Sequence, residues 1–236
     1  MVGFAWENWA NMEHLFWDPG LKACLWDLDG TLIDSYPAIA ASVNHVRKIY
    51  HFEPLPVSEI KSCVGRGIEH LLGSTVPGCD VSVASEIYGR HHAETLISGT
   101  VLLPGAASLL AALKGLGVHH AICSNKPRRF SQQLIRCLGI SSLLDALLGP
   151  EDVAMRKPAP DMLWTALSRL GFEKSQALFV GDMTVDIEAA RAAGMRVAVV
   201  ATGSDTMEDL QSSGPDFLAK DLSGLAVLLG IGPLAN

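Results

Sequence analysis

The second half of the sequence alternates short apolar runs with helical patterns, and this alternation limits the possible fold more than any other feature. Strand-like runs cover residues 21–27, 117–124, 177–182 and 196–202. Helical patterns run from Pro127 to Leu138, from Pro160 to Leu170 and from Val185 to Ala193. Strands that alternate with helices pair in parallel through right-handed crossovers. We therefore expect an α/β fold whose core is a Rossmann-like parallel sheet.

A long helical segment interrupts this pattern after the first strand. Between residues 34 and 100, helical patterns occupy residues 36–50, 58–63, 67–73 and 81–97. No convincing strand interrupts them, and Pro104-Gly105 marks the return to alternation. We expect a core domain formed by residues 21–33 and 101–236, with a helical cap domain inserted at residues 34–100.

Residues 1–20 precede the first strand and form an N-terminal extension. Three tryptophans lie in it, and Trp9, Met12 and Phe16 have the spacing of a short amphipathic helix. We expect this segment to pack on its own domain, and binding to a partner is the alternative. It has no basic start and no clear cleavage site, so we do not interpret it as a secretory signal.

Composition and charge narrow the possible partners and the location. Hydrophobic residues make up 49% of the chain, charged residues make up 18%, and the net charge is −7, which is typical of a globular protein. A negative chain is a poor match for nucleic acid or anionic membranes, and no apolar run reaches the roughly 18–20 residues of a membrane helix. The five scattered cysteines form no C-x-x-C pair, so we expect reduced thiols and a cytoplasmic location.

Polar residues follow three of the apolar strands at the point where each strand ends. They are Asp27 to Thr31, Ser124-Asn125 and Asp182. Ligands of parallel sheets bind beyond the carboxyl ends of the strands, so we expect these residues to converge. Two carboxylates as close as Asp27 and Asp29 repel unless a cation neutralises them, and Mg²⁺ prefers such oxygen ligands.

Four segments of the sequence together resemble the haloacid dehalogenase superfamily, and most closely its phosphoglycolate phosphatase-like branch. They are D-L-D-G-T-L-I-D-S at 27–35, I-C-S-N-K-P at 122–127, R-K-P-A-P at 156–160 and G-D-M-T-V-D-I-E-A-A at 181–190. The resemblance extends from residue 21 to about residue 230. It implies the fold of that superfamily and a magnesium-dependent phosphatase that acts on a small phosphorylated metabolite through an aspartyl-phosphate intermediate.

The resemblance also implies roles for individual residues. Asp27 is the expected nucleophile, and Asp29 is the expected general acid and then general base. Mg²⁺ is expected to bind Asp27, the main-chain carbonyl of Asp29 and Asp182, with Asp186 supporting Asp182. The residues expected to hold the phosphoryl group or the rest of the substrate are Thr31, Ser124, Asn125, Lys157 and, from the cap, Arg66.

Several alternatives remain open from the sequence. The presence of Asp29 argues against dehalogenase and phosphonate-cleaving relatives, but a phosphomutase or a non-catalytic binding domain are competing functions. Arg66, between Gly65 and Gly67, either reaches the substrate or begins an ordinary helix with its side chain in solvent. The pairs His91-His92 and His119-His120 are not expected to bind metal, because adjacent side chains point apart. Phosphoglycolate, a sugar phosphate and a nucleotide monophosphate all remain possible substrates.

Overall fold

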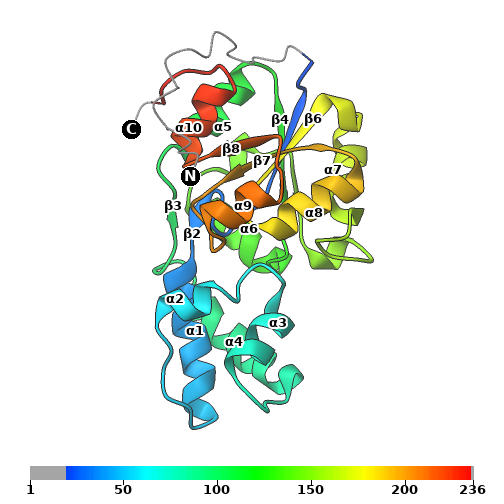
Figure 1. The fold of residues 1–236 in the computed structure, drawn as a ribbon. Coiled ribbons are helices and arrows are strands. Elements are labelled where there is room, and N and C mark those ends of the chain that lie inside the picture. The colour runs from blue at the N-terminus through cyan, green and yellow to red at the C-terminus, as the bar shows by residue number, and fades with distance from the viewer. Residues whose placement is uncertain (1–19, 235–236) are drawn as a thin grey trace, which may run out of the picture.

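A computed structural model describes residues 20–234, so the prediction for the N-terminal extension lies almost wholly outside the described residues. Six parallel strands form the main sheet in the order β5-β4-β1-β6-β7-β8 (Figure 1). Their bounds are Ala23–Trp26 (β1), His119–Cys123 (β4), Ala146–Leu148 (β5), Ala177–Gly181 (β6), Arg196–Val200 (β7) and Phe217–Ala219 (β8). The expected α/β architecture with a parallel sheet is therefore confirmed.

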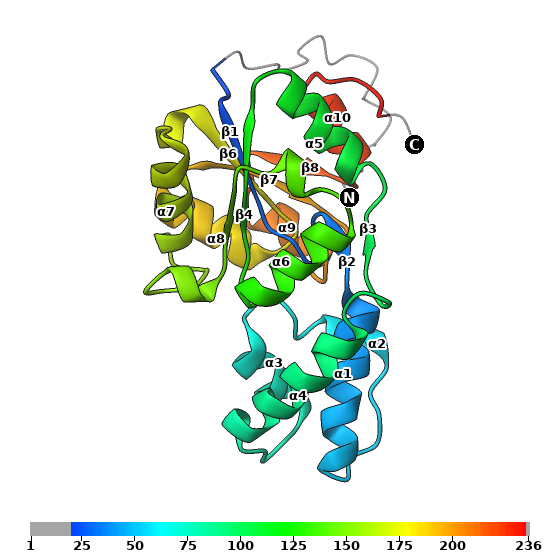
Figure 2. The same cartoon turned by 180° about the vertical axis from the view of Figure 1, so that it is seen from behind.

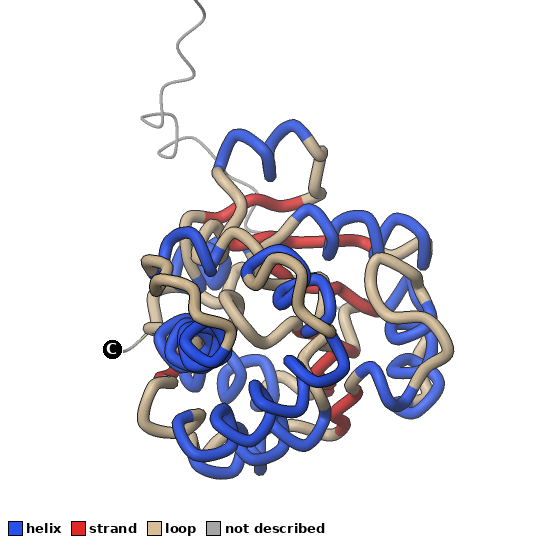
Figure 3. Tube along the Cα trace, turned by 90° about the horizontal axis from the view of Figure 1, so that it is seen from below, coloured by secondary structure: helices blue, strands red, loops and turns tan. Residues whose placement is uncertain are grey.

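Six α-helices cover the two faces of this sheet. They are α5 (Ala106–Gly115), α6 (Arg128–Cys137), α7 (Asp161–Leu170), α8 (Thr184–Ala193), α9 (Met207–Ser212) and α10 (Leu222–Leu228). Apolar residues of α5, α6 and α10 form one core cluster, and those of α7, α8 and α9 form another. Figures 1 and 2 show these two sets of helices from opposite sides, and Figure 3 shows helices on both sides of the strands.

Strand β1 shows how the sequence produces two core layers. All four of its residues are buried, because helices cover both faces of a parallel sheet. Successive side chains of a strand point to opposite faces. Cys24 and Trp26 accordingly join one cluster, and Ala23 and Leu25 join the other.

Four helices lie together beyond the carboxyl ends of the strands (Figures 1 and 2). They are α1 (Tyr36–Ile49), α2 (Val57–Lys61), α3 (Ile68–Thr75) and α4 (Val81–Thr95). A separate apolar cluster holds them to one another. Two short antiparallel strands, β2 (Ile33–Asp34) and β3 (Val101–Leu102), carry the chain into and out of this group. We interpret the four helices as the cap.

Within residues 20–234, no helix has both the length and the apolar character that crossing a membrane requires.

Candidate active site

Three neighbouring strands deliver the polar residues on which the sequence analysis depends. Strand β1 lies between β4 and β6, and these strands are followed by Asp27, Ser124 and Asp182 respectively. Because the strands are parallel, the three side chains lie at one edge of the sheet. This edge faces the cap.

Lys157 joins two of the acidic residues at this edge. Its Nζ lies 2.7 Å from Asp27 Oδ1 and 2.7 Å from Asp186 Oδ1, and all three side chains are buried. Burial alone would lower the pKa of Lys157, but the carboxylates of Asp186 and Asp27 outweigh it and raise that pKa above its ordinary value. The loop at residues 156–160 therefore places a stable positive charge beside the expected nucleophile.

The carboxylates of Asp27, Asp182 and Asp186 form a compact buried cluster, in which one oxygen of each lies within 4.8 Å of the others. Burial raises the pKa of Asp27 to about 6, against a lowering by Lys157. Burial and then the charge of Asp27 raise the pKa of Asp182 well above its ordinary value. Three carboxylates beside one lysine leave an excess of negative charge, which a divalent cation would offset.

The surroundings of Asp182 fit such a cation. Thr31 Oγ1 donates a 2.5 Å hydrogen bond to Asp182 Oδ1, whereas the buried Asp182 Oδ2 has no hydrogen-bond partner among the described residues. Glycines leave room around this second oxygen. A Cβ at Gly30 would lie 2.5 Å from it and a Cβ at Gly203 only 1.6 Å from it. A hard cation is a natural partner for a free carboxylate oxygen in such a place.

Asp186 lies within the acidic cluster and also supports the chain around it. It is in the first turn of α8, where its Oδ2 accepts hydrogen bonds of 3.1 Å from the main-chain N–H groups of Asp182 and Met183. Its other oxygen accepts from Lys157. A supporting role was expected for Asp186, and its hydrogen bonds to the main chain are of that kind.

Asp29 lies apart from the acidic cluster. Both of its carboxylate oxygens lie 3.1 Å from Lys126 Nζ, and Ser35 Oγ donates to one of them. The expectation from spacing alone, that the carboxylates of Asp27 and Asp29 flank one cation, does not match this arrangement. A cation that uses Asp29 would have to use the main-chain carbonyl, as the family resemblance implies.

Asn125 and Thr31 hold other parts of the site in place. The Asn125 side chain accepts a hydrogen bond from the Lys157 main-chain N–H at 3.1 Å and donates to its carbonyl at 3.0 Å. The same amide donates to the Gly65 carbonyl of the cap at 2.9 Å. Thr31 is fully buried against Asp182. Their geometry is that of positioning residues, while direct contact with substrate stays a prediction for both.

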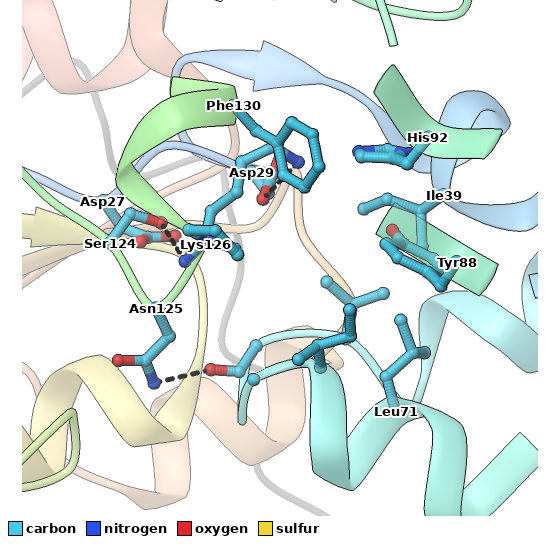
Figure 4. A pocket seen from close by; sticks show the side chains of 15 residues that line it. Asp27, Asp29, Ile39, Leu71, Tyr88, His92, Ser124, Asn125, Lys126 and Phe130 are labelled. Atoms are coloured by element: carbon cyan, nitrogen blue, oxygen red, sulfur yellow. Dashed lines mark hydrogen bonds and ion pairs between the residues drawn. The ribbon is translucent and has the colours of Figure 1, made fainter. Parts of the chain in front are cut away.

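A pocket with a cavity of about 60 Å³ lies between this edge of the sheet and the cap (Figure 4). Polar residues that line one side include Asp27, Asp29, Ser124 and Lys126. The other side is formed by the cap and includes Ile39, Leu71, Tyr88 and His92, while Phe130 of core helix α6 packs against His92. The pocket therefore places the expected reacting groups beside a largely apolar space for the rest of a small substrate.

Arg66 does not line this pocket, although the flanking Gly65 and Gly67 do. Its side chain is exposed, and contact with substrate stays a prediction that would require movement of the cap. Conversely, Lys126 and His92 were not expected in the site. The position of Lys126 two residues after Ser124 was an available signal, whereas nothing local distinguishes His92 from a surface histidine.

Comparisons with known proteins agree with this geometry. The model of the haloacid dehalogenase-like hydrolase family matches residues 24–200. A plasmid-encoded phosphoglycolate phosphatase of Cupriavidus necator is 33% identical over 213 residues, covering 88% of this chain and 92% of the relative. A phosphoglycolate phosphatase of Rhodospirillum rubrum is 32% identical, covering 89% and 91%.

A solved structure agrees as well. The crystal structure of a predicted phosphoglycolate phosphatase from Haemophilus somnus 129pt superposes with a TM-score of 0.81 at 27% identity, covering 90% of this chain and 96% of that one. The chain therefore belongs to the haloacid dehalogenase-like hydrolases, in the branch similar to phosphoglycolate phosphatases, and is an enzyme of the phosphoric monoester hydrolase class.

Proposed function

We propose that this protein hydrolyses the phosphate monoester of a small metabolite through an aspartyl-phosphate formed on Asp27, and that it requires Mg²⁺. The observation that carries this proposal is the buried Lys157, which lies 2.7 Å from Asp186 and 2.7 Å from Asp27, a residue that lines the pocket. Asp27 thereby has a fixed orientation, and the pocket above it has room for a small ester. The curated relatives are named for phosphoglycolate, which makes it the first compound to test.

Asp27 and Asp29 divide the chemistry between them. A carboxylate oxygen of Asp27 attacks phosphorus, and the bond between phosphorus and the alcohol oxygen breaks. Asp29 gives a proton to the departing alcohol. It then takes a proton from water, which attacks the aspartyl-phosphate, so that inorganic phosphate leaves and Asp27 is regenerated. Lys126 and Ser35 keep the Asp29 carboxylate oriented between these steps.

The groups around Asp27 hold the phosphoryl oxygens and balance charge. Ser124, at the end of β4, lines the pocket beside Asp27, and Lys157 supplies a permanent positive charge. Asp27 and Asp182 are the side chains that would hold Mg²⁺, together with the main-chain carbonyl of Asp29, and Asp186 would support Asp182 through its hydrogen bonds to the main chain. When bound, the ion would offset the charge on the phosphoryl group, where positioning and electrostatics supply most of the acceleration.

We also infer a cytoplasmic location. All five cysteines lie within the described residues and all five are free. Burial raises the pKa of Cys24 and of Cys123 to about 12, so neither thiol is reactive. A chain with five unpaired thiols suits a reducing compartment.

Phosphate release from phosphoglycolate and from p-nitrophenyl phosphate tests the function. We expect turnover with Mg²⁺, loss of turnover after chelation, and recovery when Mg²⁺ but not Ca²⁺ is restored, because Ca²⁺ relaxes octahedral geometry. Accumulation of free phosphate also separates hydrolysis from the phosphomutase alternative. Full activity in excess chelator would contradict the metal requirement.

The nucleophile is tested with Asp27→Asn, which keeps the shape of the side chain and removes its nucleophilicity. We expect a folded protein that has lost turnover. Asp34→Asn is the matched control, because Asp34 accepts a 3.1 Å hydrogen bond from the Tyr36 N–H at the start of α1 and is not part of the acidic cluster. Substantial turnover by Asp27→Asn would show that this residue does not form the intermediate.

A further inference from the structure

His92, on helix α4 of the cap, presents an unpaired nitrogen to the pocket. Its side chain is 1% exposed, and its Nε2 has no hydrogen-bond partner among the described residues. The ring lines the pocket on the side opposite Asp27 and Lys126 (Figure 4). A buried polar atom without a partner is destabilising, and a bound ligand would supply the missing hydrogen bond.

Aromatic neighbours hold the ring in this orientation. Tyr88 stacks on it with ring centroids 4.9 Å apart, and Phe130 meets it edge-on at the same distance. Tyr88 comes from the cap and Phe130 from α6 of the core. Because the ring is packed from both domains, its orientation is fixed before any ligand arrives.

Hydrogen bonds behind the ring determine which nitrogen carries the proton. Ser42 Oγ donates to the Ala38 carbonyl at 2.9 Å and lies 3.0 Å from His92 Nδ1. Having used its one hydrogen, Ser42 can only accept from Nδ1–H. Burial lowers the pKa of His92 to about 3, with a further lowering by Lys126, so the ring is neutral near pH 7. A neutral imidazole has one N–H, and Nε2 is therefore an acceptor.

The rest of the pocket favours a neutral leaving group over an anionic one. Ile39, Leu71 and Phe130 surround the space that His92 faces. Lys126, the cation that lines the pocket, is already paired with both oxygens of Asp29. A carboxylate there would lose its hydration and meet the lone pair of Nε2. A hydroxyl group would instead donate its hydrogen to that nitrogen.

We propose that His92 determines specificity by accepting a hydrogen bond from a hydroxyl of the leaving alcohol, so that the preferred substrates are phosphate monoesters of small polyols. This inference rests on the proposed phosphatase function and names the substrate class of the same site. The proposed role of His92 predicts that polyol phosphates are preferred over phosphoglycolate, because the leaving group of phosphoglycolate carries a carboxylate.

Two esters of equal carbon chain test the inference, namely glycerol 3-phosphate and n-propyl phosphate. We expect the unmodified enzyme to favour glycerol 3-phosphate in kcat/KM by about tenfold or more, since a site built around a hydrogen bond discriminates against analogues that lack it. Phosphoglycolate should also be a poorer substrate than glycerol 3-phosphate. His92→Phe keeps the aromatic packing and removes the acceptor, so the preference should fall close to onefold.

Two further variants separate recognition from structure. His92→Gln retains a side-chain acceptor and should keep part of the preference. The control His70→Phe alters an exposed histidine of α3 that does not line the pocket, and should leave the preference unchanged. If His92→Phe does not fold, the preference for glycerol 3-phosphate over n-propyl phosphate can still be compared between the unmodified enzyme and His92→Gln.

Hydrolysis of p-nitrophenyl phosphate distinguishes failure of this inference from failure of the proposed function. An enzyme that hydrolyses p-nitrophenyl phosphate but does not favour glycerol 3-phosphate over propyl phosphate overturns the role of His92 alone. A preference that persists in His92→Phe overturns it too. Absence of turnover on every ester overturns both proposals.

Discussion

A second histidine, His120 on strand β4, is expected to make the fold sensitive to acid. It is completely buried. The Trp26 indole donates to its Nδ1 at 3.1 Å, and its Nε2 lies 3.0 Å from the Leu110 carbonyl. An indole N–H can only donate and a carbonyl can only accept. His120 therefore fits this place as the neutral tautomer with its hydrogen on Nε2, and a second proton would face the indole N–H.

The size of the effect follows from the difference between folded and unfolded chains. Burial lowers the pKa of His120 to about 4 from its ordinary value of 6.5. Between these values the unfolded chain takes up a proton that the folded chain refuses, so folding stability is complete above pH 6.5 and falls as the pH drops toward 4. At about 1.4 kcal/mol per pKa unit, His120 alone removes roughly 2.5 kcal/mol of stability by pH 4.5.

Urea unfolding at pH 7.5 and pH 4.5 measures this contribution. The side chain of His120→Gln cannot take up a proton. The loss of unfolding free energy between pH 7.5 and pH 4.5 should therefore be about 2.5 kcal/mol smaller in His120→Gln than in the unmodified protein. His92 and the carboxylates titrate in both proteins and cancel in the difference. His119→Gln is the matched control, because His119 is half-exposed and lies outside the core. Equal acid losses in the unmodified protein and His120→Gln would refute the reasoning.

Three further variants examine the acidic cluster and the cap. Gly203→Ala places a Cβ within 1.6 Å of Asp182 Oδ2, so we expect at least a tenfold loss of kcat, while Gly115→Ala, which meets nothing within 4 Å, should leave kcat unchanged. Lys157→Met leaves two buried carboxylates without their cation and should cost about 3–5 kcal/mol of stability in thermal or urea unfolding. Arg66→Ala should raise KM for the best substrate and leave p-nitrophenyl phosphate hydrolysis unchanged if Arg66 reaches the leaving group; no change on either substrate would leave it a solvent-facing charge.

The convergence of the strand ends could be predicted because it follows from topology. Asp27, Ser124 and Asp182 are far apart in the sequence, yet each follows an apolar run. Parallel pairing puts all such positions at one edge of the sheet. In the structure the three strands are immediate neighbours. The α/β architecture was also predictable, because the local spacing of apolar residues indicates which segments are strands and which are helices.

The contacts that refine the site could not be predicted, because they depend on how distant elements pack. Lys126 lies in the loop after β4, and its contact with Asp29 depends on how that loop packs against the loop after β1. The two-residue strands β2 and β3 are too short to show an alternating pattern. Adjacent histidines on α4 were expected to point apart, yet the Nδ1 atoms of His91 and His92 both lie within hydrogen-bond distance of Ser42 Oγ. Only tertiary packing decides that His92 lines the pocket while His91 stacks on His45.

Asn125 connects the cap to the reacting groups in a way that separates recognition from chemistry. One donor of its amide reaches the Gly65 carbonyl in the cap, while the same side chain holds the main chain of Lys157 from both its N–H and its carbonyl. If the cap opened and the bond to Gly65 broke, the bonds that position Lys157 would remain within the core. Lys157, Asp27 and Asp186 would therefore stay assembled through each cycle, and His92 would move with the cap. For this reason we expect changes at His92 to alter the choice among esters, and changes in the acidic cluster to slow hydrolysis of all of them.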